Sequence, residues 1–102
     1  IPVPKNTENS YWLYTIKIKN FTKSKRNKLI KGLLKDGIET RPAFYPISEM
    51  KAYKKYINKK YDISNQISSS ILSLPTSLDL KENIIKKISN LLIKHTKKLH
   101  KV

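Results

Sequence analysis

Apolar residues recur along the chain with two different spacings, which predict strands in some segments and helices in others. Residues 11–18 alternate between apolar and polar positions and are rich in aromatic and β-branched side chains, so they predict a half-buried strand. From Ser24 to Lys35 the apolar residues form one stripe with the lysines mostly outside it, which predicts an amphipathic helix. Thr22 is placed to cap the start of that helix. The apolar face of the strand would consist of Trp12, Tyr14, Ile16 and Ile18.

The last periodic segment of the chain is the clearest one. Its apolar positions repeat at helical spacing, so we expect a helix that begins near Lys81 and frays from Thr96. Asp79 is the nearby side chain that is able to cap it. Because a single domain needs this stripe for its core, we expect the stripe to be buried. It consists of Ile84, Ile85, Ile88, Leu91 and Leu92.

Between these helices the pattern is weaker. Residues 48–60 predict a short helix with a frayed, lysine-rich end, and Ser64 is a candidate cap for another short helix that runs to Ile71. Leu72 and Leu74 then predict a brief strand that ends at the following proline. The sum is an α+β fold, with a small sheet of about three strands and helices packed mainly on one face.

Length and cysteine content limit the possible functions. A chain of 102 residues corresponds to one domain with a single modest core. Cysteine is absent, which excludes disulfides and thiolate zinc sites and fits a reducing cytoplasm. No apolar run approaches the roughly 20 residues that cross a bilayer, and no signal-peptide pattern opens the sequence. Residues 1–5 contain two prolines and predict an extended linker from a longer polypeptide.

The net charge of +15 would ordinarily point to nucleic acid or an anionic membrane surface. Of the 22 basic residues, however, only Arg26 and Arg41 are arginine, whereas readers of bases and phosphates favour its two-pronged guanidinium. The lysines are also spread over every segment. We therefore interpret the charge as solvated surface that helps to attract an anionic ligand. A basic nucleic-acid-binding module is the alternative.

The segment Gly37 to Pro46 is the most informative part of the chain. Gly37 follows the first helix where a left-handed residue is needed, a conformation that only glycine adopts cheaply. The next residues, 38–45, predict a short strand whose prolines confine it to a sheet edge. Arg41 and two aromatic residues thus lie on a segment that cannot pair fully with its neighbours. Such a segment either presents side chains to a ligand or is simply an aromatic-rich sheet edge.

Several segments together resemble one known family. The motifs Tyr11–Ile16, Gly37–Pro46 and Leu72–Pro75, with Tyr53 between them, closely resemble the C-terminal part of the DegT/DnrJ/EryC1/StrS aminotransferases. These are pyridoxal-phosphate enzymes that aminate keto-sugars carried on a nucleotide. The likeness runs from about residue 10 to residue 92, with the segments in the family's order, and only the Gly37–Pro46 block is distinctive.

The resemblance implies a domain organisation. Residues 1–9 would be a linker from a missing N-terminal large domain, residues 10–95 the small C-terminal domain of a fold-type I enzyme, and residues 96–102 a frayed basic tail. The full-length parent would bind pyridoxal phosphate and a nucleotide-sugar and would form a homodimer, with no nucleic acid and no membrane insertion. Cell-surface sugar biosynthesis is the usual destination of such products.

The resemblance also implies which residues contact the substrate. The family places the segment after "Gly-Ile-x-Thr" near the sugar and the diphosphate, where Arg41 would pair with a phosphate or carboxylate. The alternative role of Arg41 is a surface ion pair with Glu39 or Glu49, and we expect one of the two aromatic residues to fill the core. Ser48 stands where many members have histidine, which puts an imidazole contact in doubt. The candidate substrate-binding residues are Arg41, Ala43, Phe44, Tyr45, Ser48 and Tyr53.

The rest of an aminotransferase site is not expected in this chain. No lysine resembles the family's Schiff-base motif, and no glycine-rich phosphate loop is present. His95 and His100 have the wrong spacing for a shared ligand face, and we expect both to be solvated, like Asp36 and Glu39. No catalytic, cofactor-binding or metal-binding residue is therefore assigned, and the chain alone should be inactive. A regulatory or oligomerisation domain that kept the fold and lost the site is an alternative, which a solvent-inaccessible Arg41 would favour.

Overall fold

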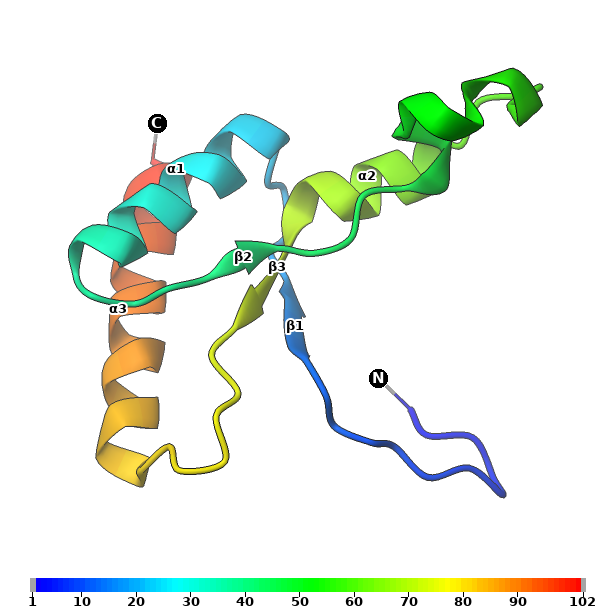
Figure 1. Ribbon diagram of the computed structural model, residues 1–102. Coiled ribbons are helices and arrows are strands. Elements are labelled where there is room, and N and C mark those ends of the chain that lie inside the picture. The colour runs from blue at the N-terminus through cyan, green and yellow to red at the C-terminus, as the bar shows by residue number, and fades with distance from the viewer. Residues whose placement is uncertain (1, 102) are drawn as a thin grey trace.

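A computed structural model describes residues 2–101, which form a three-stranded antiparallel sheet with helices (Figure 1). The central strand is β3, and β1 and β2 are the two edges, so the strand order is β1-β3-β2. In chain order the elements are β1 (Tyr14–Lys17), α1 (Lys23–Lys35), β2 (Arg41–Pro42), the 3₁₀ helices η1 (Ile47–Glu49) and η2 (Lys51–Tyr56), α2 (Asp62–Ser70), β3 (Ile71–Leu74) and α3 (Glu82–His100).

The predicted α+β class and the three-stranded sheet are confirmed, but both edge strands are shorter than expected. β1 begins only at Tyr14, because Tyr11 has a φ of 51°, a left-handed conformation that interrupts an extended strand. β2 has two residues, opposite Ser73 and Leu72 of β3, and Pro42 has no N–H with which to extend the ladder. The sheet is therefore small, and the chain leaves it directly after Pro42.

The core lies where α1 and α3 pack on the sheet. Leu29 and Leu33 of α1 and Leu72 of β3 are completely buried, and Ile88 of α3 is 6% exposed. In Figure 1 α1 and α3 lie together on one side of the sheet, as predicted, and α2 extends away from them. The remaining buried apolar residues are Ile18, Phe21 and Ile38.

Both ends of α1 are formed as the sequence predicts. The Thr22 hydroxyl accepts a hydrogen bond from the Lys25 N–H at 3.3 Å, which confirms the N-cap. At the other end Gly37 has a φ of 80°, and its N–H donates to the carbonyl of residue 34 at 3.0 Å. The Ile38 N–H donates to the Leu33 carbonyl at 2.9 Å, which completes a Schellman motif. This motif aims the following residues at the edge of the sheet.

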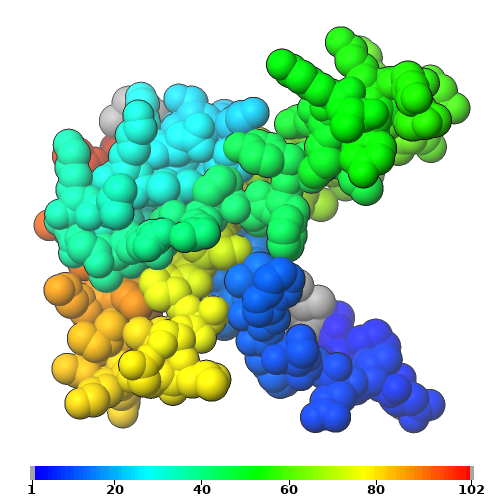
Figure 2. Space-filling view, viewed as in Figure 1, coloured from blue at the N-terminus to red at the C-terminus, as the bar shows by residue number. Residues whose placement is uncertain are grey.

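The middle of the chain differs from the prediction. Instead of one helix over residues 48–60 there are two 3₁₀ helices, η1 and η2, which contain no buried residue. A helix without a buried face gains nothing from packing, so short 3₁₀ turns are sufficient here. Figure 2 shows this segment projecting from the body of the molecule. α2 begins two residues before Ser64, with no side-chain cap, and runs without a linker into β3.

Three expectations about α3 are wrong. The helix does not fray at Thr96 but continues to His100, because its last turns pack against α1 and Phe21. Asp79 does not cap it, since that carboxylate accepts a hydrogen bond from the Ser77 hydroxyl instead. Of the apolar stripe Ile88 alone is buried, while Leu91 and Leu92 are half-buried. Its first two members, Ile84 and Ile85, are 38% and 49% exposed.

Candidate functional site

The segment after β2 carries the predicted substrate-binding residues and presents several of them to solvent. The Arg41 side chain is 79% exposed, and Phe44 and Tyr45 are 71% and 49% exposed. The expectation that one of these aromatic residues fills the core is therefore wrong. Pro42 and Pro46 take the chain off the sheet, which leaves no strand or helix to cover the rings.

Arg41 forms an ion pair with Glu39, its neighbour two residues earlier. Its Nη2 lies 2.9 Å and its Nε 3.2 Å from the same carboxylate oxygen, Oε1. Exposed pairs of this kind contribute about 0–1 kcal/mol. Exchange of Glu39 for another anion would therefore cost little. The exposure of Arg41 removes the condition that would have favoured a regulatory domain with a lost site.

Arg41 lines a pocket at the end of the sheet, with a volume of about 330 Å³. Its lining includes Leu13 and several residues with hydroxyl groups from β3 and the turn after it. One member of the lining, Thr40, is 6% exposed, and its Oγ1 is buried with no hydrogen-bond partner. In the sequence this threonine only marked the "Gly-Ile-x-Thr" motif and was not predicted to line a pocket. The other hydroxyl-bearing residues of the lining are Ser73, Thr76 and Ser77.

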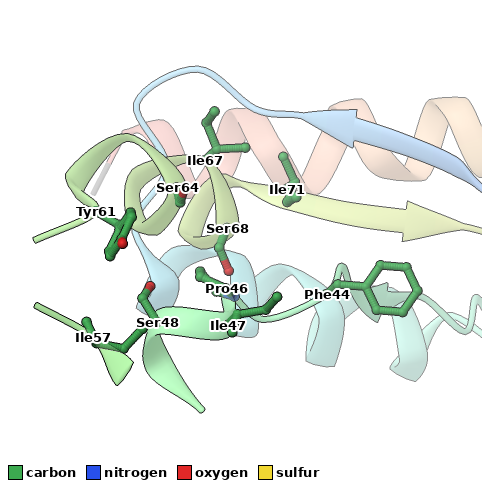
Figure 3. A pocket seen from close by; sticks show the side chains of 10 residues that line it. All are labelled: Phe44, Pro46, Ile47, Ser48, Ile57, Tyr61, Ser64, Ile67, Ser68 and Ile71. Carbon is green, nitrogen blue, oxygen red and sulfur yellow. The ribbon is translucent and has the colours of Figure 1, made fainter. Parts of the chain in front are cut away.

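A larger pocket, of about 510 Å³, opens between α2 and the segment 44–48 (Figure 3). Phe44 and Ser48 belong to it, so the structure brings two of the predicted residues to one pocket. None of the lining side chains is charged, and three are serines. Ser48 donates to the Asn65 Oδ1 of α2 at 3.4 Å, a long contact that links the two walls. The lining consists of Phe44, Pro46, Ile47, Ser48, Ile57, Tyr61, Ser64, Ile67, Ser68 and Ile71.

The wall contributed by α2 was missed in the sequence. Ser64, Ile67 and Ile71 were interpreted as a short helix with an apolar face, and an apolar face predicts burial in a core just as well as the lining of a pocket. Figure 3 shows the Ser68 side chain on α2 pointing toward Pro46 and Ile47. No local signal in the sequence separates the two roles.

The remaining predicted residues lie around these pockets without joining them. Tyr45 has the Lys23 ammonium 5.6 Å from its ring centroid, which ties it to the start of α1. Ala43 is half-buried and lies in the chain between Arg41, which lines the smaller pocket, and Phe44, which lines the larger one. Tyr53 lies on η2, is 47% exposed, and lines neither pocket.

An exposed aromatic contact extends the site toward the N-terminal segment. The rings of Trp12 and Phe44 have centroids 6.1 Å apart and are tilted by 41°. Trp12 is 70% exposed, although the strand pattern placed it on the apolar face with Ile16 and Ile18. It lies before β1 begins, so no helix covers it. Residues 12 and 44 therefore form a small aromatic surface at the rim of the larger pocket.

The two histidines are not the free, solvated side chains that the sequence suggested. His95 Nε2 lies 2.7 Å from Asp36 Oδ2, and their side chains are 22% and 38% exposed. This hydrogen bond lowers the pKa of Asp36 below its ordinary value, helped by the nearby His95 and lysine charges. The ring of His100 packs edge-on against Phe21, with centroids 5.1 Å apart. Both contacts hold α3 in place, and neither involves a residue of the two pockets described above.

Residues 2–101 offer neither a metal site nor a membrane span. No three His, Cys, Asp or Glu side chains are close enough together there to hold a metal ion. Within the same residues, no helix has both the length and the apolar character needed to span a membrane.

Comparison with known proteins identifies a family and relatives of this chain. A sequence profile of the DegT/DnrJ/EryC1/StrS aminotransferase family matches residues 1–92. The chain is 35% identical over 92 residues to the dTDP-4-amino-4,6-dideoxy-D-glucose transaminase of Escherichia coli, covering 86% of this chain and 25% of that protein. It is 31% identical over 78 residues to the GDP-perosamine synthase of Caulobacter vibrioides, covering 76% of this chain and 21% of that one.

Solved structures agree on the fold. The apo form of Spr1654 from Streptococcus pneumoniae, assigned as a sugar aminotransferase, superimposes with a TM-score of 0.81 at 21% identity, covering 87% of this chain and 23% of that one. Its pyridoxal-phosphate form gives a TM-score of 0.79 over 85% of this chain. The fold is that of a small α+β domain from a fold-type I aminotransferase. The chain belongs to the DegT/DnrJ/EryC1/StrS aminotransferase family, and it spans about a quarter of the length of the relatives it matches.

Proposed function

We propose that this chain is the substrate-side C-terminal domain of a pyridoxal-phosphate-dependent enzyme that transfers an amino group to a nucleotide-linked keto-sugar. Family membership over residues 1–92 carries the proposal. The names of two relatives, a dTDP-sugar transaminase and a GDP-perosamine synthase, support a nucleotide-sugar substrate. The product would serve cell-surface sugar biosynthesis in the cytoplasm. Residues 1–9 would be the linker, residues 10–95 the domain and residues 96–102 the basic tail.

The cofactor would be held by a large domain outside this chain. Pyridoxal phosphate, when bound, carries the amino group between donor and acceptor, and its enzymes hold it through a lysine with a lowered pKa. Among residues 2–101 every lysine is exposed except Lys25, which is half-buried on α1. No glycine-rich loop that could bind its phosphate accompanies them. The described residues do not fit the cofactor, so the chain would supply one wall of a site completed elsewhere in a homodimeric parent.

The roles within that wall follow from exposure and chemistry. Arg41 would exchange Glu39 for the diphosphate, which it can grip with two N–H groups. Phe44, with Ala43 beside it, would pack against the sugar or base. Tyr45 and Tyr53 would contact the substrate at its periphery. Ser48, where many relatives have histidine, would offer a hydroxyl and a different sugar preference.

The observations favour this function over the other two. A nucleic-acid-binding module needs basic side chains interleaved with exposed aromatics; Lys23 over Tyr45 and Lys55 over Tyr56 are two such pairs, but they lie on different elements, and the exposed Trp12 and Phe44 have no lysine among the cation–π pairs of residues 2–101. A domain that has lost its site would not be expected to leave Arg41 accessible beside two pockets.

The test is an activity assay on the full-length protein that carries this chain. The protein would be loaded with pyridoxal phosphate and incubated with dTDP- and GDP-linked keto-sugars and a panel of amino donors, and mass spectrometry would detect the amino-sugar. We expect turnover with at least one nucleotide-sugar and none with the free sugar. A protein that binds the cofactor, yields no amino-sugar and binds neither dTDP- nor GDP-sugars would overturn the proposal.

A further inference from the structure

Arg26 is a buried charged residue to which the proposed function gives no role. It is 1% exposed, and its Nη1 donates to the Ser68 carbonyl at 2.6 Å. Its Nε and Nη2 both donate to the Asn27 side-chain oxygen, at 3.2 Å and 3.1 Å. Among the described residues no carboxylate lies within ion-pair distance of it. A buried cation without a counter-charge is costly, so its hydrogen bonds must matter to the structure.

The partner of Arg26 lies at an unusual helix end. α2 runs directly into β3, and Ile71 at the junction is extended, with φ −108° and ψ 148°. The last carbonyls of a helix need donors from outside it, and the usual glycine turn is absent here. The Ser70 hydroxyl donates to the Gln66 carbonyl at 3.2 Å and to the Ile67 carbonyl at 3.0 Å. Ser69 also donates to Gln66, at 2.7 Å.

Arg26 completes this set of donors with the one charged group in it. The Ile18 N–H donates to the Ser70 carbonyl at 2.9 Å, and the Arg26 guanidinium donates to the Ser68 carbonyl. A cation at the C-terminus of a helix is also stabilised by the helix dipole. Ser69 and Ser70, part of a serine run that looks like low complexity in the sequence, thus donate at this helix end together with Arg26 and the Ile18 N–H, which directly follows β1.

The capped end of α2 is also a wall of the larger pocket. Ser68 accepts the hydrogen bond through its carbonyl, and its side chain lines the pocket opposite Pro46 and Ile47 (Figure 3). We propose that Arg26 is a positioning residue. By holding the Ser68 carbonyl it fixes α2, and so it sets the width of the pocket that Phe44 and Ser48 share. This inference rests on the proposed function, because it makes Arg26 a determinant of substrate affinity.

Three variants separate charge from geometry. Arg26→Met keeps much of the length of the side chain and removes the donors, whereas Arg26→Lys keeps the charge and loses the fork. Arg26→Ala leaves a space that added guanidinium ion can enter. Lys28→Met, an exposed change on the same helix, controls for lost charge. Ile88→Val, a core change in α3, controls for lost stability alone.

The first measurement is kinetic, in the full-length enzyme. Displacing a binding wall by about 1 Å can cost up to about a hundredfold in rate, so we expect Arg26→Met to raise the KM for the nucleotide-sugar at least about tenfold. Cofactor occupancy should stay near wild type. Arg26→Lys should recover part of the loss, and millimolar guanidinium should restore Arg26→Ala. An unchanged KM in Arg26→Met, or an equal rise in Ile88→Val, would refute the inference.

The second measurement needs no substrate. Amide hydrogen exchange should accelerate at residues 66–72 in Arg26→Met, while α3 keeps its protection. Unchanged exchange at these residues overturns the inference whatever the enzyme's substrate is. If the wild-type enzyme acts on no nucleotide-sugar while exchange rises selectively, the proposed function is wrong and the positioning of α2 by Arg26 stands.

Discussion

Thr40 offers the sharpest test of how this fold is held together. The residue is 6% exposed, and its Oγ1 is buried with no hydrogen-bond partner. A buried polar group left unpaired costs about 1–3 kcal/mol. Valine has the same branched shape and the same rotamer restriction, so Thr40→Val removes this cost without changing the packing volume. We expect the variant to be more stable by about 1 kcal/mol or more, which for a domain of this size raises Tm by about 4–8 °C.

Two other threonines provide the comparison. Thr96 Oγ1 is also buried without a partner, so Thr96→Val should stabilise the chain as well. Thr15 differs, because its hydroxyl lies 3.1 Å from that of Ser73 across the β1–β3 pair. Thr15→Val should therefore be neutral or lose up to about 1 kcal/mol. The assay is urea unfolding followed by far-ultraviolet circular dichroism. A Thr40→Val midpoint below wild type would show that the hydroxyl has a partner and that the reasoning is wrong.

Four further predictions concern single sites. An ideal Cβ at Gly32 would lie 2.8 Å from His95 Nδ1, so Gly32→Ala should stabilise by up to about 1 kcal/mol only in a His95→Ala background, as a double-mutant cycle in urea would show. The pKa of Asp36 is lower in the folded state than its ordinary value of 3.8, so this carboxylate adds stability at a pH above 3.8. That stability is lost as the pH falls through the pKa of the folded state, so Asp36→Asn should flatten the acid limb of a stability–pH curve. In the full-length enzyme, Arg41→Ala should weaken substrate binding by about 1.5–3 kcal/mol and leave cofactor occupancy unchanged, and Arg41→Lys should recover part of the lost affinity. Wild-type substrate affinity of Arg41→Ala in steady-state kinetics would contradict this. The isolated chain should show no imine absorbance band with pyridoxal phosphate, and a stoichiometric band abolished by one lysine change would contradict the expected location of the cofactor site.

Features with local signals were predictable from the sequence. The start of α1 at Thr22 and its end at Gly37 each depend on neighbours within a few residues, and both were found as expected. Strand lengths were not, because the left-handed Tyr11 has no marker in the sequence. The extent of α3 was underestimated for a related reason. Its last turns are held by His95 and Asp36, which are 59 positions apart.

The candidate site was predictable only on one side. The resemblance pointed to the segment after Gly37, and the structure places Phe44 and Ser48 at one pocket. The facing wall on α2 follows from the tertiary packing of α2 against α1, which no periodicity encodes. Arg26 is the extreme case. In the sequence it is one basic residue among 22, and only its burial and its bond to Ser68 distinguish it.

The exposure of the aromatic residues favours one of the two interpretations of the segment Gly37 to Pro46. Burying an aromatic side chain contributes about 1.5–3 kcal/mol, so a domain in which seven apolar residues are buried among residues 2–101 would gain much by covering Trp12 or Phe44. The fold instead uses Pro42 to end β2 after two residues and carries Phe44 away from the helices. A sheet edge that served only the core would turn its rings inward. Rings held at a pocket rim, on a short and rigid connection next to an exposed arginine, are arranged for contact with another molecule or domain.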